Sequence, residues 1–213
     1  MPHDKIIRQV GDYYTRKVET HGPSAQGVDW NSTESQFLRF KQLLRVAEGE
    51  SRFSINDYGC GYGGLVEYLE TLDCPFEYRG FDISQAMVGR AREIHGAKAN
   101  CRFVQDETQL EKADYTVASG IFNVKMETPV EEWKDYCLKT IDKLAGLSNK
   151  GFAFNVLTSY SDAEYMRPDL YYADPCFLFD HCKRQYSRWV SLLHDYGLYE
   201  FTILVRADNA MKE

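Results

Sequence analysis

Apolar and polar positions follow two different periods along most of the chain. From residue 53 onward, short apolar runs typical of strands are followed by longer stretches in which apolar residues recur at helical spacing. The predicted strands are residues 52–57, 77–81, 101–105, 114–119 and 151–158, and the predicted helices among them are residues 64–72, 84–95 and 130–144. Such alternation predicts an α/β fold, with a mainly parallel sheet covered by helices on both faces.

The two ends of the chain depart from this alternation. Residues 4–19 and 34–47 are amphipathic, so residues 1–50 are expected to form an N-terminal helical extension, a candidate lid, ahead of a main domain at 51–213. Near the other end, two strand-like runs, 188–194 and 198–206, are separated by a short turn at Asp195-Tyr196-Gly197. A connection that short predicts an antiparallel hairpin and brings the expected sheet to seven strands.

Composition narrows the partners and the compartment. The formal net charge of -7 argues against a nucleic-acid partner, because such binding relies on Lys and Arg. The 6 cysteines show no C-x-x-C pair and no zinc-type spacing, so we expect reduced thiols, no metal and a cytoplasmic enzyme. No apolar run is long enough for a membrane span, and no membrane partner is expected. The oligomeric state is left open.

The segment INDYGCGYGGLVEYL places a glycine-rich loop between a predicted strand and a predicted helix. Gly59, Gly61 and Gly64 fit G-x-G-x-x-G, a pattern that on its own also suits a dinucleotide site in an NAD-dependent oxidoreductase. Asp57 stands two residues before the first glycine. A carboxylate at that place repels a pyrophosphate and attracts a cation, which favours a positively charged ligand that carries a ribose.

Acidic residues also follow the next two predicted strands. Asp82 ends the second strand, where a carboxylate can accept hydrogen bonds from ribose hydroxyls, although a role in capping the next helix is an alternative. Asp106 and Glu107 follow the third strand and can receive the amine of adenine, with an ordinary loop acid as the alternative for Asp106. Ile83 and Met87 are placed to pack on the adenine ring.

The order of these motifs resembles that of the class I S-adenosylmethionine-dependent methyltransferases over roughly residues 53–206. The motifs are NDYGCGYGG, FDIS, VQDE, ADYTVASGIFNV, NKGFAFNVLT and the closing hairpin. The resemblance implies a Rossmann-like sheet whose seventh strand is antiparallel, with S-adenosyl-L-methionine as cofactor. It also implies that Asp57, Gly59 and Gly61 hold the amino-acid part, Asp82 and Ile83 the ribose, and Asp106 and Glu107 the adenine. Ser119 is implied to add a backbone contact, and Asn123 to face the acceptor.

Further candidates come from the extension and from an aromatic loop. Arg39 can reach the methionine carboxylate and Trp30 can close over the pocket, with surface and packing roles as the alternatives. The loop SYSDAEYMRPDLYYAD offers Tyr160, Tyr171 and Tyr172 for the acceptor, although aromatic clusters more often belong to a core. Candidates for a catalytic base are His194, His181 and Tyr160. A structural role paired with Asp195 is the favoured alternative for His194, and a solvated side chain is the alternative for His181.

These observations predict methyl transfer to a small molecule, at O or N, with release of S-adenosylhomocysteine. The tetrapeptide of amino-methylating DNA enzymes is absent after the fourth strand, as is the paired-glutamate loop of protein arginine methyltransferases. Two other readings stay open: an NAD-dependent oxidoreductase, and a non-catalytic module that only binds S-adenosylmethionine.

Overall fold

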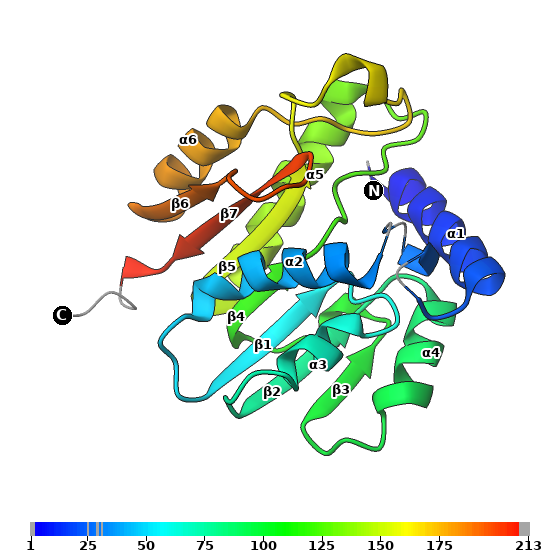
Figure 1. The fold of residues 1–213 in the computed structure, drawn as a ribbon, viewed down its shortest axis with the longest axis vertical. Helices are drawn as coiled ribbons and strands as arrows, with labels where there is room; N and C mark the ends of the chain where they lie inside the picture. The colour runs from blue at the N-terminus through cyan, green and yellow to red at the C-terminus, as the bar shows by residue number, and fades with distance from the viewer. Residues whose placement is uncertain (1–2, 25, 29, 31, 209–213) are drawn as a thin grey trace.

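The core of the fold is a single seven-stranded sheet. A computed structural model describes residues 3–24, 26–28, 30 and 32–208 (Figure 1). The strands follow the order β3-β2-β1-β4-β5-β7-β6 across the sheet. Their bounds are β1 (Phe53–Tyr58), β2 (Phe76–Phe81), β3 (Cys101–Val104), β4 (Ala113–Ala118), β5 (Ser148–Leu157), β6 (Trp189–Leu193) and β7 (Glu200–Arg206).

Strands β1 to β5 are parallel, and β7 is antiparallel to both of its neighbours. The predicted α/β class, the mainly parallel sheet and the closing antiparallel hairpin are therefore confirmed. Strand β1 is buried along almost its whole length, and this burial includes the polar side chains of Asn56 and Asp57.

Helices cover both faces of the sheet. Their bounds are α1 (Asp4–His21), α2 (Thr33–Leu44), α3 (Gly64–Leu69), α4 (Gln85–His95), α5 (Val130–Gly146) and α6 (Pro175–Gln185), with short 3-10 turns at η1 (Gln26–Val28), η2 (Arg45–Ala47), η3 (Glu107–Gln109) and η4 (Ala163–Tyr165). Helices α2 and α3 lie in front of the sheet in Figure 1 and α5 lies behind it. Their side chains build two hydrophobic cores, one on each face.

The first 50 residues divide into two parts with different roles. Helix α2 contributes Phe40, Leu43 and Leu44 to the core that also contains Ile55 of β1, so it is one of the covering helices of the sheet. Helix α1 instead packs beside α4, at the end of the sheet where the parallel strands finish (Figure 1). Within the described part of this extension, α1 and η1 therefore have the position of a cover over the strand ends.

Local capping explains where several helices begin. Ser32 and Ser35 form a reciprocal capping box at the start of α2, with the Ser32 hydroxyl accepting the Ser35 N–H at 3.2 Å. The predicted helix at 34–47 differs at its end, because Arg45 begins the 3-10 turn η2. The predicted helix at 64–72 ends earlier, at Leu69.

Throughout the described ranges, no helix combines the length and the apolar character that a membrane crossing requires.

Candidate cofactor and acceptor site

The glycine loop turns tightly between β1 and α3. Gly59, Gly61 and Gly63 have φ values of 84°, 54° and 86°, a region that favours glycine. The N–H groups of Gly59 and Cys60 both donate to the carbonyl of Phe81, at 2.7 and 2.9 Å. A Cβ on Gly59 would lie 2.3 Å from Cγ2 of Ile121, so the loop requires glycine there. Gly63, which the sequence pattern did not single out, is the N-cap of α3.

Asp82 connects this loop to the start of α4. Its carboxylate accepts the Gly61 N–H at 2.9 Å and the Ser84 N–H at 2.8 Å. The N-cap itself is Ser84, whose hydroxyl accepts the Met87 N–H. The helix-cap role considered for Asp82 therefore belongs to its neighbour, and Asp82 holds two backbone segments at the strand ends in register.

Asp57 lies on the same edge of the sheet, one strand away. The register pairs Asp57 with Gly80 of β2, which brings the two carboxylates to neighbouring strand ends. The Asp57 side chain accepts the Tyr78 hydroxyl at 2.8 Å. Burial raises the pKa of Asp57 to about 7. The Tyr78 hydrogen bond opposes this increase, and the negative charge of Asp82 adds to it. Burial also raises the pKa of Asp82, to about 6.

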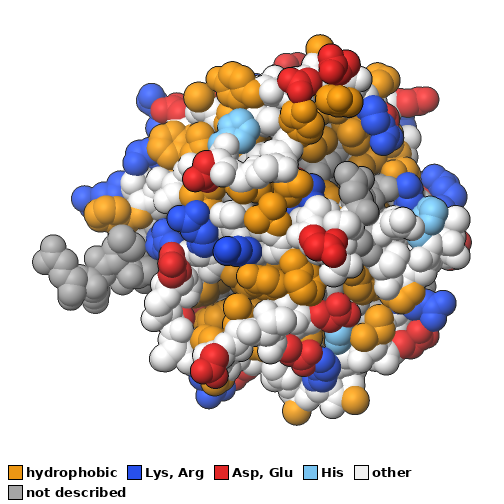
Figure 2. Space-filling model, viewed as in Figure 1, with side chains coloured by type: hydrophobic (Ala, Val, Ile, Leu, Met, Phe, Trp, Pro, Cys, Tyr) orange, Lys and Arg blue, Asp and Glu red, His pale blue; other side chains and the backbone are white. Residues whose placement is uncertain are grey.

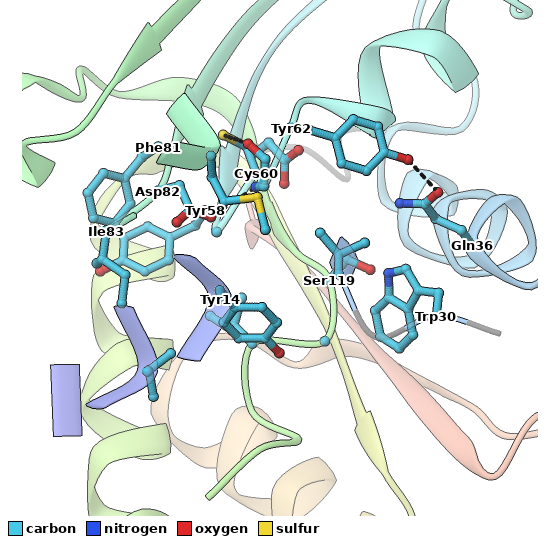
Figure 3. A pocket seen from close by; sticks show the side chains of 18 of the residues that line it. Tyr14, Trp30, Gln36, Tyr58, Cys60, Tyr62, Phe81, Asp82, Ile83 and Ser119 are labelled. Carbon is cyan, nitrogen blue, oxygen red and sulfur yellow. Dashed lines mark hydrogen bonds between the residues drawn. The ribbon is translucent and has the colours of Figure 1, made fainter. Parts of the chain in front are cut away.

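A central cavity opens over these acids and the glycine loop (Figure 3). Figure 3 shows aromatic side chains from several elements around it, among them Tyr14, Trp30 and Tyr62. The Tyr62 hydroxyl donates to Gln36 at 3.0 Å. The central cavity is lined by the following predicted cofactor residues: Trp30, Asp57, Gly59, Gly61, Asp82, Ile83, Met87 and Ser119. The hydroxyl of Ser119 is buried and has no hydrogen-bond partner among the described residues.

An edge cavity continues from the central cavity past Ile83, which lines both. It contains the other two predicted cofactor acids, Asp106 and Glu107. The Asp106 carboxylate accepts the N–H and the hydroxyl of Thr108, and these hydrogen bonds lower its pKa. Glu107 forms an ion pair with Lys143 at 2.7 Å.

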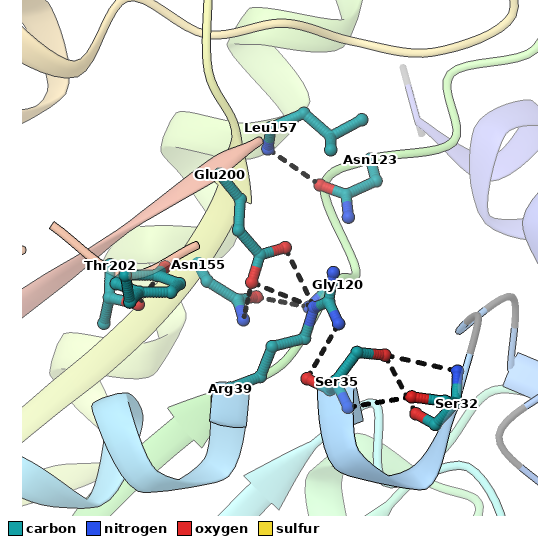
Figure 4. Close-up of polar contacts among 10 residues, drawn as sticks. Ser32, Ser35, Arg39, Gly120, Asn123, Asn155, Leu157, Glu200 and Thr202 are labelled. Carbon is teal, nitrogen blue, oxygen red and sulfur yellow. Dashed lines mark hydrogen bonds and ion pairs between the residues drawn. The ribbon is translucent and has the colours of Figure 1, made fainter. Parts of the chain in front are cut away.

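Arg39 has a different position from the one expected of a ligand to the cofactor carboxylate. Its Nε lies 2.9 Å from the carboxylate of Glu200 on β7, and both side chains are buried (Figure 4). Glu200 accepts the amide of Asn155 at 3.4 Å, and Asn155 in turn accepts the Gly120 N–H at 2.6 Å. The guanidinium also lies 3.9 Å from the ring centroid of Trp30. Arg39 thus belongs to a buried network that positions the loop after β4.

An outer cavity lies on the far side of Trp30. Tyr14, Val28, Trp30 and Gly120 line both the central and the outer cavity, so they form the partition between the two. Predicted acceptor residue Asn123 lines the outer cavity, and its Oδ1 accepts the Leu157 N–H at 3.1 Å. The sequence patterns did not identify Tyr14, because an aromatic residue in an amphipathic helix has no feature that separates a ligand contact from packing.

The remaining candidates do not come together at these cavities. Tyr160 is 69% exposed and contacts the His194 ring, and Tyr171 is buried in a hydrophobic core. The Tyr172 hydroxyl accepts the Arg167 N–H, and His181 stacks on Phe177 within α6. None of these side chains lines the central, edge or outer cavity.

Comparisons with known proteins agree with this geometry. A protein of Mycobacterium tuberculosis, named putative methyltransferase Rv1506c, is 53% identical over 163 residues, which cover 76% of this chain and 98% of the relative. No family model matches the chain.

Two solved structures share the fold at low identity. Magnesium protoporphyrin IX methyltransferase from Synechocystis PCC 6803 with bound SAM has a TM-score of 0.56 at 19% identity, covering 83% of this chain and 78% of that one. N-methyltransferase NodS from Bradyrhizobium japonicum WM9 with S-adenosyl-L-homocysteine has a TM-score of 0.64 at 14% identity, covering 93% and 98%.

The fold and the acids at its strand ends define a Rossmann-like enzyme of the methyltransferase type. Together with the 53% identical relative, they show that the chain belongs to the class I S-adenosylmethionine-dependent methyltransferases. This membership excludes the NAD-dependent alternative.

Proposed function

We propose that this enzyme transfers a methyl group from S-adenosylmethionine to a small-molecule acceptor, at O or N, and releases S-adenosylhomocysteine. The observation that carries the proposal is the pair of buried carboxylates, Asp57 and Asp82, at neighbouring strand ends beneath one cavity. A pyrophosphate would be repelled there, whereas a sulfonium and an ammonium group are stabilised.

The residues of the central and edge cavities fit the parts of this cofactor in order. We assign Asp57 and the loop glycines to the amino-acid part, and Asp82 to the ribose hydroxyls. Ser119 lines the same cavity, and its buried hydroxyl, which has no partner among the described residues, suits a polar cofactor atom once the side chain turns toward it. Ile83 and Met87 suit the faces of the adenine ring, and Asp106 with Glu107 suits its polar edge. Arg39 is left out of this assignment because Glu200 already holds its guanidinium.

When bound, the cofactor supplies a methyl group on a positively charged sulfur. The task of the chain is then to align an acceptor and exclude water. Tyr14 and Trp30 stand where the central and outer cavities meet, so we assign them to the passage between cofactor and acceptor. We assign the acceptor to the outer cavity, beside Asn123.

The scale of the cavities and the surface charge favour a small acceptor. Basic and acidic side chains are interspersed over the face shown in Figure 2, without a broad basic area of the kind that nucleic acid requires.

We further propose that α1 and η1 act as a lid, because they cover the strand ends and contribute Tyr14 and Val28 to the partition. The six free cysteines suit the reducing cytoplasm, where we place the enzyme.

Two measurements test the proposal. Calorimetry with S-adenosylmethionine and S-adenosylhomocysteine is expected to show saturable binding of both by folded protein. Incubation with a metabolite panel, followed by mass spectrometry, is expected to show at least one product heavier by a methyl group. Absence of cofactor binding contradicts the proposal. Binding without transfer to any acceptor supports instead the non-catalytic module.

A further inference from the structure

Most N–H groups of the glycine loop already donate to partners within the protein. Those of Gly59 and Cys60 donate to one carbonyl of β2. The N–H of Gly61 donates to Asp82, and that of Gly63 donates to the carbonyl of Cys60. A ligand that lies against this loop therefore depends mainly on side chains for its hydrogen bonds.

The amino-acid end of the cofactor assigned to the central cavity carries both an ammonium and a carboxylate group. Asp57 and Asp82 suit the ammonium and the sulfonium, but they repel the carboxylate. The described lining of this cavity contains no Lys, Arg or His, and Arg39 is held by Glu200 outside that lining. Among the described residues, only a neutral donor in this cavity can receive the carboxylate.

Gln36 on α2 and Tyr62 in the glycine loop form a hydrogen-bonded pair in the wall of the central cavity. Both residues line the cavity, with 3% and 6% of their surface exposed. The Tyr62 hydroxyl donates to Oε1 of Gln36 at 3.0 Å, whereas the amide nitrogen of Gln36 has no partner among the described residues. Figure 3 shows that nitrogen turned away from α2, on the side of the cavity. The pair therefore presents a fixed amide N–H₂ group to a ligand.

This pair lies against the end of the glycine loop. A Cβ added to Gly64, the first residue of α3, would lie 3.0 Å from the Tyr62 hydroxyl oxygen and 3.1 Å from Nε2 of Gln36. The amide thus stands beside the loop to which the amino-acid part of the cofactor is assigned. Asp106 and Glu107, assigned to adenine, line the edge cavity, which Gln36 does not reach. The two positions suit the two ends of a ligand that spans both cavities.

We propose that Gln36 binds the methionine carboxylate of S-adenosylmethionine through its amide N–H₂ group, and that Tyr62 is a positioning residue that fixes the amide in this orientation. The inference rests on the proposed function, because it names the binding residue for one group of that cofactor. A hydrogen bond from a neutral amide to a carboxylate is charge-assisted, and burial strengthens it. A neutral donor also leaves the cavity without a positive charge that would repel the sulfonium.

Two ligands isolate the contribution of the carboxylate. S-adenosylhomocysteine and its decarboxylated analogue differ only in that group, so calorimetry with both gives the ratio of their affinities for each variant. Gln36→Glu keeps the size of the side chain and replaces the donor by an acid. We expect it to lower the affinity for S-adenosylhomocysteine, relative to the analogue, by about tenfold or more. Gln36→Met removes the donor without adding a charge, and we expect a fall of about tenfold in the same ratio should Gln36→Glu fold poorly.

Gln42→Glu is the matched control on the same helix. Gln42 is 8% exposed, accepts a hydrogen bond from Arg45 at 3.3 Å and lines none of the central, edge and outer cavities. The same change of amide to acid is therefore made outside the site, and the ratio of affinities should match that of the wild-type protein.

Tyr62→Phe tests the positioning role. The variant keeps the ring and removes the hydroxyl that holds the amide, so we expect the ratio to fall by about threefold. In protein that already carries Gln36→Met, the same change should leave the ratio as it is, because no amide remains to be held. An effect of Tyr62→Phe that persists in that background contradicts the positioning role.

Equal affinity of the wild-type protein for the two ligands overturns the inference, because the carboxylate would then have no effective partner. A ratio in Gln36→Met that equals the wild-type ratio also overturns it. So does a fall in Gln42→Glu as large as that in Gln36→Glu, which would show a diffuse effect of charge. Absence of S-adenosylhomocysteine binding by folded wild-type protein is a separate failure, that of the proposed function.

Discussion

The guanidinium of Arg39 and the carboxylate of Glu200 form an ion pair that joins residues 161 positions apart in the sequence. Glu200 has no exposed surface and Arg39 retains 8% of its own. Through Asn155, the pair reaches the N–H of Gly120 on the partition between the central and outer cavities. The pair therefore couples the position of α2 to that of the loop after β4.

Removal of one partner of this pair is expected to destabilise the protein strongly. Glu200→Ala leaves the Arg39 guanidinium buried without its carboxylate, and we expect the free energy of unfolding to fall by about 3–5 kcal/mol. Glu77→Ala is the control, because its ion pair with Arg52 is exposed and worth about 1 kcal/mol or less. Denaturant unfolding monitored by circular dichroism measures both. Similar small losses in the two variants would show that the buried pair has no special weight.

Asp82 is expected to support cofactor binding directly. Asp82→Ala should weaken S-adenosylmethionine binding by about 1–3 kcal/mol, through lost charge-assisted hydrogen bonds to the ligand and a looser Gly61 backbone. Ser84→Ala removes the N-cap of α4 without touching the carboxylate, so it should lower stability by about 1 kcal/mol and change affinity little. Calorimetry and thermal unfolding separate these effects. Unchanged affinity in Asp82→Ala would assign Asp82 a structural role only.

Asp57 is expected to lower the free energy of unfolding at neutral pH, although it strengthens the binding of S-adenosylmethionine. Its pKa is raised from 3.8 to about 7 in the folded protein, so folding becomes less favourable as the pH rises from about 4 to about 7 and the buried carboxylate ionises. Asp57→Asn removes this effect and keeps an acceptor for the Tyr78 hydroxyl. We expect its stability to rise by about 1 kcal/mol or more at pH 8, or about 2–4 °C in Tm, with a smaller gain at pH 5.

The same variant is expected to bind S-adenosylmethionine more weakly, because the cofactor loses a negative partner. Asp73→Asn, at an exposed position away from the cavities, controls for the loss of one charge. A lower Tm of Asp57→Asn at pH 8 would contradict the stability argument.

Cofactor affinity is expected to depend on pH in a defined direction. The pKa values of Asp57 and Asp82 are raised to about 7 and about 6, so both carboxyl groups ionise near neutral pH. The cationic cofactor binds better to the ionised carboxylates than to the neutral acids. Affinity for S-adenosylmethionine should therefore rise between pH 5.5 and pH 8, and binding near pH 6.5 should release protons. Calorimetry in buffers of different ionisation enthalpy measures that release. An affinity that is flat or falls over this range, or the same profile in Asp57→Asn, would refute the argument.

The close approach of Gly120 to Trp30 is expected to matter for turnover. Gly120 has a φ of 73°, and an added Cβ would lie 2.3 Å from Cη2 of Trp30. Gly120→Ala should displace the indole from the partition and reduce kcat/KM for the acceptor about tenfold or more. Gly146→Ala, where an added Cβ meets nothing within 4 Å, is the control and should leave kcat/KM unchanged. Steady-state kinetics with any acceptor found in the panel tests both variants.

The pattern of residues along the chain was sufficient to predict most of the fold. The alternation of strands and helices over residues 53–158, the antiparallel hairpin, the glycine loop and the acids at the ends of β1, β2 and β3 follow from the sequence. The physical reason is that helical and strand periods, turn glycines and strand-end positions are set by neighbours along the chain. In a parallel sheet those strand ends meet at one edge, so Asp57 and Asp82 are brought together by topology alone.

Only the tertiary structure decided which distant side chains share a cavity. Lys17, Arg39 and Arg167 have ordinary positions in the sequence, and their convergence on the outer cavity depends on how α1, α2 and the segment after β5 pack at the end of the sheet. The pairing of Arg39 with Glu200 and the place of Tyr14 in the partition likewise arise from contacts between elements. Such contacts leave no periodic trace in the sequence, because each depends on side-chain packing between segments that are close only after folding.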